Sequence, residues 1–294
     1  MAVSARLIRS RIKSVSNTKK ITKAMELVSA AKMRRAVMLA TAARRYAALG
    51  AGLLKNLSAL GAAVDHPFFR RVVEPQKVLC IVIGSDRGLC GAYNASLMRS
   101  VDMAMAKFAN ADFIVAGRHA ELALRRAGRR IIAAFSGLTN APRAASIRPI
   151  VSLAESEFVS KVYDAVLIAS TNYISAMRQV PEVKELLPLV DRSEISLAAA
   201  TEVSSRLPAE TLFEPDPATV LEYTLPRFLE ASVYQAVLEA AASEHSARMM
   251  SMRSASDAAS DMVTDLTFTL NQARQSAITS EIAEISAGRA ALEG

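Results

Sequence analysis

Proline and glycine, the residues that most disrupt an α-helix, are absent from two long stretches at the ends of this 294-residue chain. The stretches are Met1–Leu49 and Arg227–Ala287, whereas all ten prolines lie between Pro67 and Pro226. An α-helix rises about 1.5 Å per residue, so the C-terminal stretch alone predicts a helix roughly 90 Å long, longer than a small domain is wide. Such a helix needs a partner along its length, and the other terminal helix is the most economical one.

The N-terminal stretch carries a heptad pattern that predicts where the two helices meet. Its apolar residues follow the alternating spacing of three and four that is typical of a coiled-coil seam: Ile21, Met25, Val28, Leu39, Ala42, Tyr46, Leu49 and Leu53. Lys32 and Arg35 interrupt this seam, which costs stability and fixes the register.

The C-terminal helix has a matching apolar side and a stretch of small residues. The apolar side is formed by Leu229, Val233, Ala236, Ala240, Ala247 and Met250. Further along, Ala255, Ala258 and Ala259 would let two backbones approach closely, and we expect the closest approach at Ala258. This helix is expected to begin near Pro226, because a proline in the first turn of a helix costs little.

Short apolar runs alternate with amphipathic stretches in the middle of the chain. The runs predict strands at Lys77–Ile83, Asp112–Ala116, Arg130–Phe135 and Asp164–Ala169, separated by helices near Ala92–Ala109, Arg118–Ala127 and Ile147–Lys161. Glu182–Leu187 predicts a further strand. The fold class is therefore α/β: a long antiparallel coiled coil of the terminal helices with an inserted Rossmann-like, mostly parallel α/β domain. We expect three segments, at residues 1–65, 76–213 and 214–294.

The net charge of +8 is concentrated in the first helix. Residues 1–60 contain 13 lysines and arginines and a single acidic residue, Glu26. A rod of this kind is attracted to an acidic surface, which can be nucleic acid, anionic lipid or an acidic protein loop, or it is simply a solvated helix face. The basic residues are interleaved with seam residues rather than with exposed aromatics, so the pattern does not indicate a nucleic-acid-reading module.

Gly84–Gly91 follows the first predicted strand, where a doubly wound fold places its phosphate-binding loop. The segment contains neither G-x-G-x-x-G nor G-x-x-x-x-G-K-[ST], and it has no lysine to reach a phosphate. We interpret it as a structural turn or a protein-contact loop, with a nucleotide-dependent enzyme as the weaker alternative. A thiol enzyme built from Cys90, His119 and Asp86 has still less support.

Other classes of site are not indicated. The two cysteines and three histidines have neither a disulfide-framework pattern nor a zinc spacing, so no metal and no cofactor is expected. No apolar run reaches the length of about 20 residues that crosses a bilayer. We therefore expect a soluble protein without a membrane span.

Several strings of residues nevertheless match one known family in the same order along the chain. Arg11–Met25 closely resembles the N-terminal helix of the gamma subunit of F-type ATP synthase, and Ser85–Asn94 resembles the first strand-to-helix loop of that family. The match continues through Glu214–Pro217, Val233–Gln235, Ser243–Met249 and Ala273–Ile285.

The resemblance implies a central-stalk rotor without an active site of its own. Its coiled coil would enter a ring of three alpha and three beta subunits, while its globular domain would meet the epsilon subunit and the c-ring of the membrane sector. Rotation driven by ion flow would take the beta subunits through their binding states. The chain would then lie peripherally on the cytoplasmic face of the bacterial plasma membrane and bind no nucleic acid.

The resemblance also implies roles for single residues. Lys20, Lys23 and Met25 resemble a collar that faces acidic loops of the beta subunits. Contacts to a beta-subunit loop are implied for Arg248, Arg274 and Gln275, with polar contacts nearby from Thr279 and Glu281. Two features bear on variation within the family: Gly288-Arg289 stands where the family usually has Gly-Ala, and residues 191–213 lack the cysteines of the plant-type regulatory insertion.

Overall fold

The computed structural model describes residues 5–59, 66–70, 72–189, 214 and 216–293. The chain forms two compact units. One consists of residues up to Ser29 together with residues from Met249 onward, and the other of Ala30–Arg248. Helices α1 (Ala5–Ala59) and α5 (Pro217–Glu293) contribute to both units. The predicted three-segment division at residues 1–65, 76–213 and 214–294 remains a prediction.

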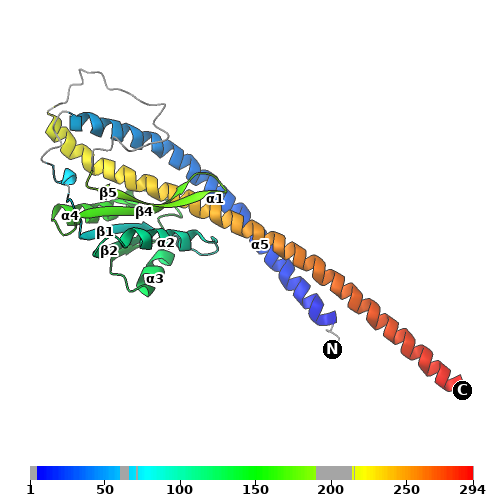
Figure 1. Cartoon of the computed structure of the whole chain (residues 1–294). Helices are drawn as coiled ribbons and strands as arrows, with labels where there is room; N and C mark the ends of the chain where they lie inside the picture. Colours follow the sequence, from blue (N-terminus) through cyan, green and yellow to red (C-terminus); the bar gives the residue numbers. More distant parts are fainter. Residues whose placement is uncertain (1–4, 60–65, 71, 190–213, 215, 294) are drawn as a thin grey trace. The chain divides into compact units, whose positions relative to one another are not determined.

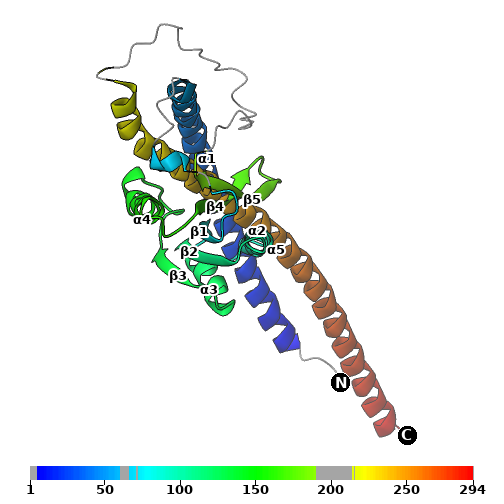
Figure 2. The ribbon, with the colours of Figure 1, turned by 60° about the vertical axis from the view of Figure 1, so that its left-hand side comes forward.

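The larger unit contains a five-stranded sheet in the order β3-β2-β1-β4-β5 (Figure 1; β3 is labelled in Figure 2). Its strands are β1 (Lys77–Ile83), β2 (Asn110–Ala116), β3 (Ile131–Phe135), β4 (Ala165–Tyr173) and β5 (Gln179–Leu187). The first four strands are parallel, and β5 runs antiparallel to β4. The connecting segments hold α2 (Tyr93–Met105), α3 (Arg118–Arg126), α4 (Arg148–Val159) and the short 3-10 turns η1 (Pro67–Phe69) and η2 (Ala144–Ser146). This confirms the predicted Rossmann-like domain, including its fifth strand.

Helices cover both faces of the sheet, which explains why the central strands are apolar throughout. Helices α2 and α3 pack on one face, where Cys80 is fully buried as a small core residue, as expected. The other face packs against α4 and a stripe of α5 (Figure 1 and Figure 2). That stripe has the spacing of one helix face and consists of Leu221, Leu225, Leu229, Val233, Val237 and Ala240.

Helix α5 begins at Pro217, so the predicted start near Pro226 was wrong. Asp216 caps the helix: the Thr219 amide donates to its side chain at 2.9 Å, and the Val220 amide donates to its carbonyl at 3.1 Å. Pro217 then occupies the first helical position, where a missing N–H is harmless. The helix continues through Pro226 because the apolar stripe on either side of that proline packs into the core of the sheet domain.

The two long helices pair in antiparallel fashion in the larger unit. Arg44 of α1 forms an ion pair with Glu239 at 2.9 Å, and further along α1 Gly50 lies against the ring of Phe228. In the smaller unit, the Lys19 ammonium donates to Ser260 Oγ at 2.9 Å. The predicted pairing of the terminal helices is confirmed.

The predicted seam of α1 was wrong by about one residue around the helix. Most of its large members are exposed, with Ile21 61%, Val28 57% and Tyr46 64% accessible, while Met25 is half-buried. The side chain of Leu53 lies outside the described part of the structure. The buried residues of α1 are instead mostly small, namely Ile8, Thr22, Ser29, Ala36 and Ala40. Small side chains allow the two backbones to approach closely, so burial here does not follow hydrophobicity.

The expected point of closest approach on α5 also moves by one residue. Ala258 is exposed, whereas Ala259 is only 8% accessible and Ser256 only 5%. One row of buried and half-buried positions runs along α5 in the smaller unit with a spacing of four and three: Met252, Ser256, Ala259, Val263, Leu266, Leu270 and Ala273. This is the coiled-coil face of α5.

Candidate functional site

The carboxyl ends of β1 and β4 form the switch point of the sheet, because β2 lies on one side of β1 and β4 on the other. In doubly wound folds, ligands bind outside this edge. The loop that follows β1 is tightly tied. The Ser85 amide donates to Asn94 Oδ1 at 3.1 Å, and Asp86 accepts hydrogen bonds from the amides of Arg118 (3.4 Å) and Gly137 (2.7 Å).

Helix α5 occupies this edge with a run of buried residues between Ala240 and Arg248. The Ser243 hydroxyl donates to the carbonyl of Thr171 at the end of β4 (3.0 Å), and the Tyr93 hydroxyl donates to the carbonyl of Ala240 (3.3 Å). The place of a ligand in a doubly wound fold is therefore taken by the chain itself.

The Arg248 guanidinium lies against the loop that follows β1. It is 6% accessible, its Nε donates to the Gly88 carbonyl at 3.1 Å, and its Nη2 donates to the Arg87 carbonyl at 2.8 Å. A phosphate-binding loop turns amide N–H groups toward an anion, whereas this loop turns two carbonyl oxygens toward a cation. The geometry therefore supports our interpretation of the loop as a structural turn or protein-contact loop.

Two neighbours hold Arg248 in place from the same helix. Glu244 accepts a hydrogen bond from Nη2 at 2.8 Å, and His245 Nδ1 lies 3.2 Å from Nη1. Because a guanidinium can only donate, this Nδ1 is the acceptor of a neutral imidazole. Burial is the main cause that lowers the pKa of His245 to about 4, followed by the charges of Arg248 and Lys32.

The thiol-enzyme alternative gains no support from this geometry. Cys90 is 3% accessible, and burial raises the pKa of its thiol above the ordinary value. Its Sγ lies 3.8 Å from Ser85 Oγ and 3.4 Å from Asn94 Nδ2, which are poor activating groups. A reactive cysteine requires the opposite, a lowered pKa and access to solvent.

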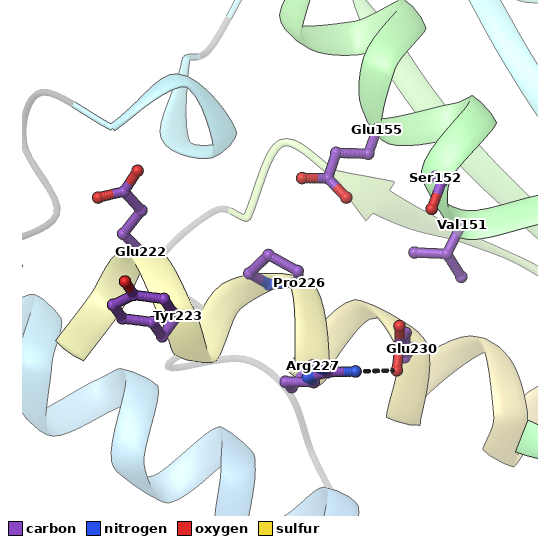
Figure 3. A pocket seen from close by; sticks show the side chains of 8 residues that line it. All are labelled: Val151, Ser152, Glu155, Glu222, Tyr223, Pro226, Arg227 and Glu230. Carbon is purple, nitrogen blue, oxygen red and sulfur yellow. Dashed lines mark hydrogen bonds and ion pairs between the residues drawn. The ribbon is translucent and has the colours of Figure 1, made fainter. Parts of the chain in front are cut away.

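One cleft that the sequence did not predict lies between α4 and α5 (Figure 3). Its volume is about 250 Å³, and three glutamates line it: Glu155, Glu222 and Glu230. Glu230 is already paired with Arg227 (3.1 Å) and Arg148 (3.5 Å). Burial and the charge of Glu230 raise the pKa of Glu155.

Among the described residues, no group of three or more histidines, cysteines and carboxylates is arranged to hold a metal ion. In the same part of the chain, no helix is both long and apolar enough to cross a membrane.

Seven of the eight predicted contact residues lie in the smaller unit. Lys20, Arg274, Gln275, Thr279 and Glu281 are exposed, Met25 is half-buried, and the Lys23 side chain is 57% accessible while it pairs with Glu26 at 2.9 Å. Since Lys19 bonds to Ser260, the collar and the group that begins at Arg274 are separated by about 20 Å along α5. Arg248 differs from the others because it is buried in the larger unit.

A family model described as ATP synthase matches residues 4–292. An ATP synthase gamma chain of Herpetosiphon aurantiacus is 39% identical, with 98% of this chain and 99% of the relative covered. The gamma chain of Opitutus terrae is 40% identical, with 97% of this chain and 98% of the relative covered. The chain belongs to the ATP synthase gamma-chain family.

Solved structures share the gamma-chain fold. A chain of the Euglena gracilis mitochondrial ATP synthase, from a structure of OSCP/F1/c-ring, aligns with a TM-score of 0.70 at 18% identity and covers 98% of this chain and 94% of its own length. A chain from the central stalk/c-ring structure of the Tetrahymena thermophila mitochondrial ATP synthase aligns with a TM-score of 0.60 at 23% identity. The alignment covers 80% of this chain and 99% of that chain. The resemblance stated from the sequence is confirmed.

Proposed function

We propose that the chain is the central-stalk rotor subunit of an F-type ATP synthase, which couples ion flow through the membrane sector to ATP synthesis or hydrolysis in the beta subunits by rotation. The observation that carries this proposal is the match to gamma chains over nearly the full length of both partners. Two long paired helices, as a rotor shaft requires, support it further.

The rotor performs no chemistry itself, and the beta subunits hold the catalytic sites. This part of the proposal is supported by the carboxyl edge of the sheet, where α5 takes the place of a ligand and Arg248 bonds to two carbonyls of the loop that follows β1. The chain requires no cofactor for this role. A stiff body that transmits torque needs packed helices rather than a catalytic group.

Electrostatics suit the proposed contacts with the catalytic head. Lys20, Lys23 and Met25 meet acidic loops of the beta subunits, and Arg274, Gln275, Thr279 and Glu281 form a second set of contacts nearer the C-terminus. The ion pair with Glu26 does not prevent Lys23 from contacting a beta subunit, because a surface pair of this kind is worth only about 0–1 kcal/mol. The sheet domain meets the epsilon subunit and the c-ring, so that the complex holds the chain peripherally on the cytoplasmic face of the bacterial plasma membrane.

A rotation assay tests the proposal. Met177, 83% accessible in the turn between β4 and β5, is replaced by cysteine and labelled with a probe, while Cys80 and Cys90 stay unlabelled because they are buried. The full chain is assembled with alpha and beta subunits, which are fixed to a surface. We expect ATP to drive stepwise rotation in one direction. ATP hydrolysis accompanied only by random motion of the probe would contradict the proposal, as would failure of the three chains to assemble.

A further inference from the structure

The loop that follows β1 holds a backbone conformation that side chains rarely adopt. Leu89 has a φ of 61°, in the left-handed region, and Gly91 has a φ of 58°. A residue such as Leu89 stays in this region only where the surrounding structure holds it there. The same loop exposes Arg87 and leaves Leu89 61% accessible. Something must therefore fix a strained backbone whose side chains point outward.

The first part of the loop is fixed by the sheet domain itself. Asn94 bonds to the amide and hydroxyl of Ser85, and Asp86 accepts the amides of Arg118 and Gly137. Further along the loop, the contacts made by the sheet domain are weak ones to a thiol: Cys90 Sγ lies 3.4 Å from Asn94 Nδ2, 3.8 Å from Ser85 Oγ and 3.9 Å from the Arg87 carbonyl.

The strong contacts in this second part come from α5. Arg248 reaches the carbonyls of Arg87 and Gly88 at 2.8 and 3.1 Å, although it is 160 residues away from Gly88 in the chain. Its guanidinium is itself held by Glu244 and His245, so all three nitrogens are engaged. Charge-assisted hydrogen bonds of this kind are about twice as strong as neutral ones. Only the planar fork of an arginine can make them all at once.

We infer that Arg248 is a positioning residue, whose buried guanidinium holds the loop Ser85–Gly91 against α5 and fixes the backbone that presents Arg87 and Leu89. We call Arg248, Glu244, His245 and the carbonyls of Arg87 and Gly88 the Arg248 latch. The latch operates in the isolated chain, whatever its partners are. It gives Arg248 an effect on partners that is indirect, through the surface of the loop.

Amide hydrogen exchange in the full-length chain tests the latch. We expect Arg248→Ala to speed exchange of the amides from Gly88 to Tyr93 by about 10- to 100-fold, because the loop loses its charge-assisted contacts. Amides of β2 should keep the wild-type rate. Arg227→Ala is the matched control on the same helix, since Arg227 is an exposed arginine paired with Glu230, and it should leave the loop unchanged.

Chemical rescue separates a specific latch from general loosening. Millimolar guanidinium ion should enter the space left in the Arg248→Ala chain and restore slow exchange of the loop, whereas the same concentration of urea should not. Arg248→Lys should restore protection only in part, because an ammonium lacks the fork. Loop exchange that matches the wild type, or that guanidinium and urea affect equally, would overturn the inference. If Arg248→Ala unfolds the domain, Arg248→Lys decides: unchanged loop protection in that variant also overturns it.

Discussion

At the scale of single residues, His245 shows how surroundings set a protonation state. Burial, Arg248 and Lys32 lower its pKa from 6.5 to about 4, while a hydrogen bond with the backbone of Thr139 acts in the opposite direction. Glu244 is also buried, and desolvation raises the pKa of its carboxyl despite the adjacent Arg248. Acidification therefore lowers the stability of the fold through His245 and raises it through Glu244.

The first prediction concerns stability against pH. Between pH 6.5 and about 4 the unfolded chain binds a proton at His245 that the folded chain does not, so this residue makes stability fall as pH falls through that window, by up to about 3 kcal/mol. The raised pKa of Glu244 changes stability in the opposite direction, so the quantity to measure is the difference in pH-dependent stability between the wild type and His245→Gln. Urea unfolding at pH 7 and pH 5 should show a smaller loss in His245→Gln than in the wild type. Equal losses would show that His245 is not held neutral.

The second prediction concerns the basic collar. Replacing both Lys20 and Lys23 by glutamate puts like charges opposite the acidic loops proposed for the beta subunits, so ATP hydrolysis and ion pumping should become less tightly coupled. Added salt should relieve part of the defect, because it screens exposed charges. The control is Lys107→Glu, an exposed lysine of the sheet domain. A coupling ratio that neither variant changes at any salt concentration would mean that the collar is only a solvated face.

At the scale of elements, periodicity predicted the elements far better than their contacts. The strand Lys77–Ile83 is found with its predicted bounds because a run of buried apolar residues has few alternatives. The seam of α1 was wrong because hydropathy ranks Ile21 above Thr22 and Val28 above Ser29, whereas close packing selects the smaller side chain. The start of α5 at Pro217 could have been predicted correctly, since an aspartate before a proline is a signal for the N-terminus of a helix. Arg248 was found by resemblance, but its loop contacts depend on the fold.

The third prediction tests the corrected face of α5. Ala259 is 8% accessible, so a leucine at residue 259 must push the helices apart. Ala258 is exposed, so a leucine at residue 258 faces water. We expect Ala259→Leu to destabilise the coiled coil by about 1–3 kcal/mol and Ala258→Leu to have little effect. Thermal unfolding followed by circular dichroism measures both. A larger loss in Ala258→Leu would restore the original seam.

At the scale of the whole molecule, α5 belongs to the sheet domain as much as to the helical pair. Leu229 and its neighbours in the stripe lie in the same core cluster as residues of β1, β2 and β4. The sheet of the larger unit therefore has no complete core without this helix. A mutation on α5 is expected to act on strands that are remote from it in sequence.

The fourth prediction follows from this shared core. Leu229 is 1% accessible, so Leu229→Ala should cost about 2–5 kcal/mol and shift the unfolding of helix and sheet together. Circular dichroism and hydrogen exchange of β1 amides should report one common transition. Leu122→Ala, at a position of α3 that is 43% accessible, is the control and should cost much less. Loss of helix signal without faster exchange in β1 would show that the two parts fold separately.

The stripe of α5 also determines how the sheet domain resists a torque. Turning the domain about the helix axis would pull Leu221, Leu225, Leu229, Val233 and Val237 out of its core. Burial of each such side chain is worth about 1.5–3 kcal/mol, so the turn would cost roughly 8–15 kcal/mol, as much as unfolding an ordinary domain. A torque applied to the sheet domain is therefore transmitted to α5 without the domain turning around the helix. The first deformation would be elastic twisting of α5 itself.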